Sequence, residues 1–280
     1  MTLSLQHING IAFIGGGNMA TSIVGGLINN TFEAHKIFIS EPNSELATKL
    51  ASQYQINIAA SNSAACATCD VIVLAVKPQI LKTVCEEIAP QLHDNHLIIS
   101  IAAGINSESL TKWLGKKAVV RTMPNTPALI SEGACGLFAC AEVNDSQRDI
   151  ADHIMMSVGI TAWVSNEDLI DSVTAISGSG PAYFFLMIES MIDAGEKMGL
   201  DHETASTLAL QTAYGAAKLA LQSDVDIKEL RRRVTSPKGT TEKAIESFES
   251  NNFRQTIEHA MKACAERGKS LAEELGQNDL

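Results

Sequence analysis

The sequence is short of positive charge. Its 280 residues contain 21 lysines and arginines against 32 aspartates and glutamates, which gives a formal net charge of −11. Because nucleic acids and anionic lipid surfaces attract basic proteins, this balance argues against either of them as the main partner. A small anionic ligand remains compatible with it, since distant surface charges are screened and such a ligand senses only its own pocket.

Long uncharged apolar runs are also missing. The most apolar long stretch, residues 181–200, contains three acidic residues and a lysine, which argues against a membrane span. The first predicted strand begins at Ile11, so we expect no cleavable signal peptide ahead of it. Six cysteines in a long chain without such a signal favour reduced thiols and a cytoplasmic location.

Several patterns of catalytic and metal sites are absent. No serine lies in a nucleophile elbow, and no carboxylate pair indicates glycoside or metal chemistry. Cys66 and Cys69 have the C-x-x-C spacing, but no second pair or nearby histidine completes a zinc site. We therefore expect two ordinary thiols and no metal. His93 and His96 flank a polar turn and are expected to be solvated.

What the sequence does contain is a glycine-rich turn after a short apolar run. Residues 11–14 (IAFI) predict a strand, three glycines follow, and a helical pattern begins at once. Gly15, Gly17 and Ala20 occupy the small positions of the G-x-G-x-x-G/A dinucleotide fingerprint. Glycines allow the turn and a close approach to a pyrophosphate, and free amides at the helix start face the phosphates. Taken alone, the pattern is equally compatible with an ordinary strand–helix turn.

Strand-like and helix-like segments alternate up to about residue 165. Continuous apolar strands such as 71–76 are typical of a parallel sheet buried on both faces. We therefore predict an α/β fold, with an N-terminal doubly wound (Rossmann) parallel sheet in a dinucleotide-binding domain over residues 1–165. The predicted strands are 11–14, 36–40, 71–76, 97–102, 118–121, 134–139 and 161–164, and the predicted helices are 19–29, 45–53, 63–67, 80–89, 107–113 and 146–157.

Strand signals stop after about residue 165. Residues 181–200 and 202–222 predict two helices, each with only a narrow polar stripe. Helices that are apolar around most of their circumference must be buried on most sides, and a short helical segment does not bury two of them alone. We therefore expect an all-α C-terminal domain over residues 166–280 that forms a subunit interface.

Two small-residue elements interrupt the helical part. Residues 174–183 (TAISGSGPAY) lead into the first helix, and tight packing explains them as well as a ligand site does. Residues 234–241 (VTSPKGTT) offer hydroxyls at Ser236, Thr240 and Thr241, and free amides at a helix start, which suit a carboxylate or a phosphate. The alternative is a helix-capping loop, which local chemistry alone slightly favours.

Glu41 bears on the choice of dinucleotide. It follows the second predicted strand, where such sites usually have an acid that binds the ribose hydroxyls. No arginine between residues 40 and 49 is available for a 2′-phosphate, which by itself favours NADH. Ser40, Asn43 and Ser44 keep NADPH open, because they can hydrogen-bond a phosphate if Glu41 points away.

Two turns end strands at the edge where doubly wound sheets bind ligands. In the first, residues 75–78 (AVKP), Lys77 is either a ribose or pyrophosphate contact or a solvated turn residue. The second, residues 123–127 (MPNTP), faces the same crevice by the same rule.

Taken together, these residues resemble the pyrroline-5-carboxylate reductase family. The resemblance implies reduction of Δ1-pyrroline-5-carboxylate to L-proline by NAD(P)H, the last step of proline biosynthesis. It also implies a homodimer intertwined through the C-terminal helices, often assembled further into a homodecamer. The stretches that carry it are IGGGNM at 14–19, AVKP at 75–78, SIAAG at 100–104, RTMPNTP at 121–127, SGSGPAY at 177–183 and SPKGTT at 236–241.

By position, the resemblance also assigns the residues that hold the cofactor. The family prefers NADPH, which makes NADPH the expected cofactor and NADH the alternative. Asn62 would contact the adenosine ribose. The pyrophosphate would be held by Gly15, Gly17, Asn18 and Met19, and the length of the dinucleotide would be contacted by Ala75, Val76, Lys77 and Pro78.

The substrate site follows from the last stretch. Ser236, Gly239 and Thr240 would bind the substrate carboxylate, and Thr241 would be the catalytic hydroxyl that reaches the ring nitrogen. The family usually has Ser-Pro-Gly-Gly-Thr-Thr, whereas Lys238 replaces the first glycine here. If φ is positive there, a lysine costs on the order of 1 kcal/mol, although it could also bring a charge toward the carboxylate.

Two other functions stay open from the residues alone. A dehydrogenase acting on a β-hydroxy acid would need a catalytic lysine or histidine in the second domain, and the sequence offers no convincing candidate. A nucleotide-sensing protein would bind NADPH without oxidising it.

Overall fold

The structure is a computed structural model that describes residue 5 and residues 7–276. The chain divides into two compact units. Met1–Ser179 and Cys264–Leu280 form the first unit, and Gly180–Ala263 forms the second.

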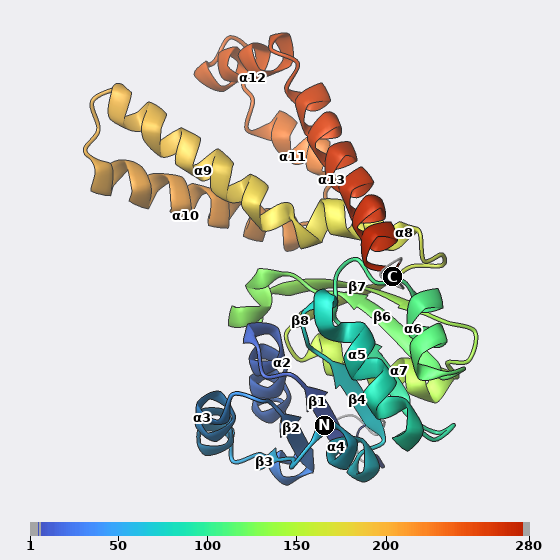
Figure 1. The fold of residues 1–280 in the computed structure, drawn as a ribbon. Helices are drawn as coiled ribbons and strands as arrows, with labels where there is room; N and C mark the ends of the chain where they lie inside the picture. Colours follow the sequence, from blue (N-terminus) through green and yellow to red (C-terminus); the bar gives the residue numbers. More distant parts are fainter. Residues whose placement is uncertain (1–4, 6, 277–280) are drawn as a thin grey trace. The chain divides into compact units, whose positions relative to one another are not determined.

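A sheet of eight strands within the described residues organises the first unit (Figure 1). The strand order is β3-β2-β1-β4-β5-β6-β7-β8, so β1 lies between β2 and β4. The chain changes its direction of growth at β1, and such a switch point is where doubly wound sheets bind ligands. The strands are β1 (Ile11–Ile14), β2 (Ile37–Ser40), β3 (Asn57–Ile58), β4 (Val71–Leu74), β5 (Leu97–Ser100), β6 (Ala118–Met123), β7 (Gly133–Ala139) and β8 (Gly159–Trp163).

The helices of this unit begin at caps that the sequence encodes. Asn43 and Asn106 are N-caps whose side chains accept hydrogen bonds from the first amides of their helices. Asn144 and Gln147 form a reciprocal capping box. The helices are α2 (Asn18–Asn29), α3 (Ser44–Tyr54), α4 (Asn62–Thr68), α5 (Pro78–Ile88), α6 (Ser107–Leu114), α7 (Asp145–Met156) and α8 (Leu169–Val173), with short turns η1 (Ala34–Lys36), η2 (Ala89–Gln91), η3 (Thr126–Ile130) and η4 (Thr174–Gly178).

The sheet separates two apolar cores. Alternate residues of a strand point to opposite faces, so Ile11 and Phe13 pack in a core with α2 and α7. Ala12 and Ile14 pack in the other core, with α4, α5 and α6. Burial on both faces explains why β4 is apolar without interruption and fully buried. A sheet with helices on both faces confirms the predicted α/β doubly wound fold.

The prediction of a parallel sheet is wrong for one pair of strands. β7 runs antiparallel to β6, while the other neighbours in the sheet are parallel. Only residues 124–132 connect β6 to β7, and most of them form the turn η3. A parallel crossover needs about a dozen residues or more, so this connection is too short for one.

The prediction that both histidines of the 93–96 turn are solvated is wrong for His96. His93 is exposed, whereas only 7% of His96 is accessible. The N–H of His93 donates to Nδ1 of His96 at 2.8 Å, which holds the ring inward at the start of β5. Burial lowers the pKa of His96, with His93 contributing in the same direction.

The second unit is entirely helical within the described residues. α9 (Gly180–Lys197) and α10 (His202–Leu221) form a hairpin, followed by α11 (Ile227–Arg233) and α12 (Thr240–Ser250). The long α13 (Phe253–Gly276) begins in this unit, and its residues from Cys264 onward belong to the first unit. Gly195 lets α9 and α10 pack closely, because a Cβ at this position would lie only 3.2 Å from the Cβ of Ala205.

The hairpin leaves its apolar faces uncovered within one chain. Its buried residues are small: Gly180 and Gly195 on α9, Ala205 and Ala209 on α10. The large apolar side chains that it exposes include Phe184, Phe185, Leu186, Met191, Leu208, Leu210, Leu219 and Leu221. Apolar surface of this extent marks an interaction site, which supports the predicted subunit interface.

Other features bear on predicted absences. No helix of the described chain is long and apolar enough to span a membrane. No group of three or more histidine, cysteine or acidic side chains in the described residues is placed to hold a metal ion. All six cysteines, each of which lies in the described part, are free thiols, and burial raises the pKa of Cys66 and Cys69 to about 12. The two are therefore the inert thiols expected from the sequence.

Candidate active site

The glycine turn lies at the carboxyl end of β1, where the chain enters α2. Gly15 has a φ of +101°, and its N–H donates to the carbonyl of Ser40 at the end of β2 (2.8 Å). A Cβ on Gly15 would lie 2.7 Å from the carbonyl oxygen of Ala75, so both the backbone angle and the space require glycine. The turn is therefore packed against the strand ends on either side of β1.

The start of α2 is open. Gly17 is its N-cap, and no side chain of the described residues caps the helix. Outside the neighbouring residues of its own chain segment, no described atom lies within 4 Å of the position of a Cβ on Gly17. The amides of the first turn, which includes Asn18 and Met19, thus have no intrahelical partner and point toward a space that an anion can enter.

Glu41 closes one side of this turn. Its Oε2 accepts a hydrogen bond from the N–H of Gly16 (2.8 Å), and its Oε1 accepts one from the N–H of Asn43 (2.9 Å). The half-buried carboxylate therefore lies beside the glycine turn, directly after β2.

Asn62 belongs to a chain of side-chain hydrogen bonds at the same edge. Its Oδ1 accepts from the hydroxyl of Ser40 (2.7 Å), and its Nδ2 donates to Oε2 of Glu87 (2.9 Å). Ser61 precedes it as the N-cap of α4. The predicted ribose contact is thus held next to the end of β2.

The 75–78 turn is brought beside the glycine turn. Ala75 N–H donates to the carbonyl of Ile14 (2.9 Å), and Val76 Cγ1 would lie 3.1 Å from a Cβ on Gly15. Lys77 is the exposed N-cap of α5, and Pro78 begins that helix. The structure therefore brings the predicted cofactor residues together around the carboxyl ends of β1, β2 and β4.

Residues 174–183 show the close packing that small side chains allow. A Cβ on Gly178 would lie 2.6 Å from the terminal carbon of Met123. Asn125 links the turn after β6 to this segment, because its Nδ2 donates to the carbonyl of Ser177 (3.0 Å). This observation favours the packing explanation of the residues up to Gly178.

The substrate element predicted at 236–241 lies in the second unit. The N–H of Gly239 donates to the carbonyl of Ser236 (3.0 Å), which closes a turn directly before α12. Gly239 is the N-cap, and no side chain in the described part caps this helix. Thr240 and Thr241 are the first two helical residues, both exposed, so neither acts as the threonine cap of the alternative explanation.

Lys238 has the positive φ that its place in the family pattern suggested. Its φ is +58°, in the left-handed region, and its N–H donates to Oε2 of Glu242 (2.7 Å). A lysine in this conformation is strained relative to glycine. The exposed side chain starts beside the open amides of α12.

A partly buried ion pair was missed from the sequence. Nη1 of Arg121 donates to Oε1 of Glu167 (2.9 Å), and the same carboxylate accepts from the backbone N–H (2.6 Å) and the hydroxyl of Ser107. Arg121, Glu167 and Asp171 line a polar cavity of about 740 Å³, where burial raises the pKa of Asp171 against the opposing effect of Arg121. The partners are far apart along the chain, so no local pattern reveals them.

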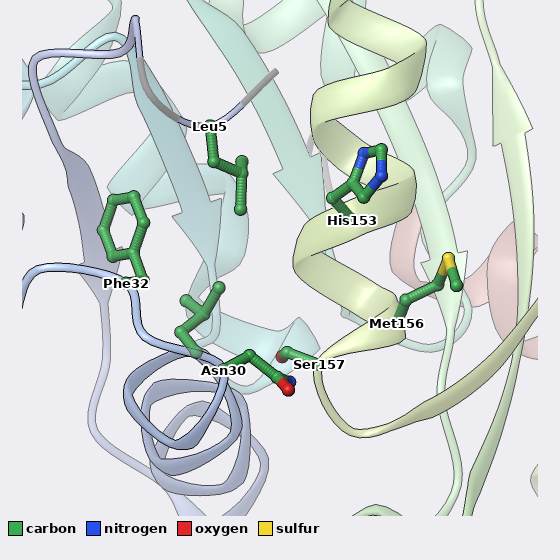
Figure 2. A pocket seen from close by; sticks show the side chains of 7 residues that line it. Leu5, Asn30, Phe32, His153, Met156 and Ser157 are labelled. Atoms are coloured by element: carbon green, nitrogen blue, oxygen red, sulfur yellow. The ribbon is translucent and has the colours of Figure 1, made fainter. Parts of the chain in front are cut away.

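A smaller cavity of about 240 Å³ lies elsewhere in the first unit (Figure 2). Asn30, Phe32, His153 and Ser157 are among its lining residues. It is at the C-terminal end of α2, and a helix of 12 residues is about 18 Å long, so the glycine turn is distant from it. Ligand pockets usually exceed about 300 Å³, and we assign no ligand to this one.

The glycine turn, the open helix start and the switch point of the sheet together define a dinucleotide-binding protein of the Rossmann class. Comparisons with known proteins narrow the class. A family model described as pyrroline-5-carboxylate reductase dimerisation matches residues 167–271, and one described as NADP oxidoreductase, coenzyme F420-dependent, matches residues 10–104. The chain belongs to the pyrroline-5-carboxylate reductase family.

Individual relatives support this assignment over nearly the whole chain. The chain is 54% identical to the pyrroline-5-carboxylate reductase of Pseudomonas aeruginosa, over 95% of this chain and 98% of that protein. Among solved structures, a pyrroline-5-carboxylate reductase from Coxiella burnetii matches with a TM-score of 0.92 and 43% identity, over 94% of this chain and 98% of that one. The structure of the pyrroline carboxylate reductase from Plasmodium falciparum with NADP bound matches with a TM-score of 0.82 and 34% identity. The match covers 94% of this chain and 98% of that one.

Proposed function

We propose that this chain reduces Δ1-pyrroline-5-carboxylate to L-proline with NAD(P)H, the last step of proline biosynthesis. Sequence identities of 54% and 43% to named pyrroline-5-carboxylate reductases, over more than nine-tenths of the chain, support this reaction. The observation that carries it structurally is the turn before α12, where uncapped amides stand beside the hydroxyls of Ser236, Thr240 and Thr241. Such a group of donors suits a small carboxylate.

The residues of the glycine turn fit a dinucleotide. A Cβ on Gly15 would clash with the carbonyl oxygen of Ala75, and the α2 amides have no side-chain cap among the described residues. The proposed cofactor contacts are Gly15, Gly17, Asn18, Met19, Asn62, Ala75, Val76, Lys77 and Pro78. When bound, the reduced nicotinamide supplies a hydride.

The reaction adds that hydride to C5 of the ring imine and a proton to its nitrogen. We propose that Ser236, Gly239 and Thr240 bind the substrate carboxylate, chiefly through backbone N–H groups, and that Thr241 directs its hydroxyl to the ring nitrogen. An imine is already electrophilic, so these residues act mainly by orienting it. This role is compatible with the few acid–base groups in the turn.

The two proposed domains have different functions. Residues 1–165 form the dinucleotide-binding domain and residues 166–280 the substrate-binding and dimerisation domain. Two observations support a boundary near residue 165: β8 ends at Trp163, and the dimerisation family model begins at residue 167. The compact units divide differently, because residues 166–179 and 264–276 belong to the first unit. The chain forms an oligomer through the latter region, and we propose a homodimer through the C-terminal helices, with a homodecamer as the larger assembly.

Charge and thiols support the proposed location and partners. Six free cysteines in the described chain are typical of a reducing compartment, which supports a cytoplasmic location. A net charge of −11 supports a small-molecule substrate as the partner, with neither nucleic acid nor membrane.

One assay tests the function against both alternatives. The purified oligomer is mixed with NADH or NADPH and Δ1-pyrroline-5-carboxylate, and consumption of the reduced nicotinamide is followed by its absorbance. We expect consumption that depends on the imine and yields proline. Binding without consumption would support a nucleotide sensor, and oxidation of β-hydroxy acids with NAD⁺ or NADP⁺ would support the other dehydrogenase class.

A further inference from the structure

We propose that Glu41 selects NADH over NADPH in this chain. The inference rests on the proposed function, because it assumes that the glycine turn binds a reduced nicotinamide dinucleotide. It concerns the one chemical difference between the two cofactors, the 2′-phosphate on the adenosine ribose.

The carboxylate of Glu41 is fixed by backbone on two sides. Gly16 N–H donates to one oxygen at 2.8 Å, and Asn43 N–H donates to the other at 2.9 Å. In this fold class the adenosine ribose lies at the end of the second strand, which is where Glu41 stands. Each carboxylate oxygen keeps a further lone pair, so both can still accept hydrogen bonds from ribose hydroxyls.

A 2′-phosphate in this place would meet a negative charge. A phosphate monoester carries about −1.5 to −2 charges at neutral pH, and like charges held together at a binding site cost several-fold to many-fold in affinity. No lysine or arginine occurs in residues 37–48 to offset the repulsion, and Lys49 is an exposed residue in the middle of α3. The local charge therefore favours a ribose with a free 2′-hydroxyl.

Several hydrogen-bond donors around Glu41 already have partners. The hydroxyl of Ser40 donates to Asn62. The amides of Glu45 and Leu46, at the start of α3, both donate to Oδ1 of Asn43 at 3.1 Å. A phosphate that used these donors would have to displace one of these bonds, whereas ribose hydroxyls bring their own donors to Glu41.

The competing arrangement keeps NADPH. In it, Glu41 rotates outward and leaves the amides of Gly16 and Asn43 to the phosphate. The two arrangements differ in what removal of the charge does. If the carboxylate faces the ribose, Glu41→Gln relieves the repulsion; if it has rotated away, the same change leaves the preference as it was.

The test measures binding and turnover on the same oligomeric protein. Isothermal titration calorimetry gives Kd for NAD⁺ and NADP⁺, and the imine-dependent assay gives kcat/KM for NADH and NADPH. We expect the wild-type chain to favour the non-phosphorylated forms at least tenfold in both ratios. Glu41→Gln should reduce each preference at least tenfold, and the wild-type preference should shrink at high salt.

Glu45→Gln is the matched control. It removes a carboxylate from the first turn of α3, four residues after Glu41 and without contact to the glycine turn. It should change the Kd ratio and the kcat/KM ratio by less than about threefold. A wild-type preference for the phosphorylated forms, or a ratio unaltered by Glu41→Gln, would overturn the inference while leaving imine reduction intact. If neither dinucleotide binds the wild-type protein, the proposed function fails and this inference fails with it.

Discussion

At the scale of single residues, Lys238 combines an unfavourable backbone angle with a place in the proposed substrate turn. Its φ of +58° is costly for a residue with a Cβ, and the hydrogen bond from its N–H to Glu242 helps to hold that angle. Lys238→Gly should therefore raise the free energy of unfolding by about 0.5–1 kcal/mol, after the greater freedom of glycine in the unfolded chain is subtracted. Chemical denaturation measures the change.

Lys238→Ala separates strain from charge at this position. It removes the ammonium group but keeps the Cβ, so it should not stabilise the protein. Equal stabilisation by alanine and glycine would show that charge, and not the left-handed backbone, is the cause.

Thr241 is the residue on which the proposed chemistry depends most directly. It is exposed at the second position of α12, beside uncapped amides. Thr241→Val keeps its shape and removes the hydroxyl, and should lower kcat/KM for the imine by roughly 10- to 100-fold. Steady-state kinetics checks this, with Thr256→Val as control, since that hydroxyl, on α13, donates to the carbonyl of Asn252 directly before the helix. An unchanged kcat/KM would remove Thr241 from the mechanism.

At the scale of elements, local pattern predicted most of the sheet, and tertiary contacts decided the rest. β4 (Val71–Leu74) was predicted, as part of a strand over residues 71–76, because a continuous apolar run needs burial on both faces. β3 was missed because it is only two residues long. The antiparallel direction of β7 was missed because it depends on the length of the connection over residues 124–132. α13 was not predicted, since charged residues are spread through its sequence and blur its apolar positions.

In the candidate site, too, local pattern predicted some features and tertiary contacts decided the others. The glycine turn is legible in the sequence, because a positive φ and a close backbone approach both require glycine. Two interactions could not be predicted from the sequence, because each joins residues that only the fold brings together. They are the hydrogen bond from Gly16 to Glu41 and the ion pair of Arg121 with Glu167. The inward position of His96 likewise depends on its neighbours.

The start of β5 carries a pH dependence that follows from His96. Burial and His93 lower its pKa, Asp70 and a hydrogen bond with the backbone of Cys69 act in the opposite direction, and Lys117 adds to the lowering. The unfolded chain therefore binds the proton more readily. Stability from this group is complete above the ordinary histidine pKa of about 6.5 and decreases as pH falls toward the lower folded value.

Denaturation at a series of pH values between neutral and mildly acid measures this effect. His96→Gln should flatten the decrease relative to wild type, whereas His93→Gln, at the exposed position, should leave most of it. If His96→Gln shows the wild-type slope, another group is responsible for the pH dependence.

At the scale of the whole molecule, the exposed apolar faces of α9 and α10 require a partner. Phe184 and Phe185 are 68% and 65% exposed in the single chain, next to Leu186 at 63%. The dimerisation family model covers both helices, so the surface that one chain leaves open is the surface at which a second copy should be seated. A charge placed there would be buried without a partner on association.

Phe184→Glu should therefore shift the oligomer to smaller species. An unpaired buried charge costs about 3–5 kcal/mol, so the dissociation constant between subunits should rise at least 100-fold. Sedimentation analysis over a range of concentrations measures it, with Ile58→Glu as control, because Ile58 is an exposed apolar residue on β3 in the first unit. Unaltered association of Phe184→Glu would place the subunit interface away from α9, whereas dissociation by both variants would indicate a general loss of folding.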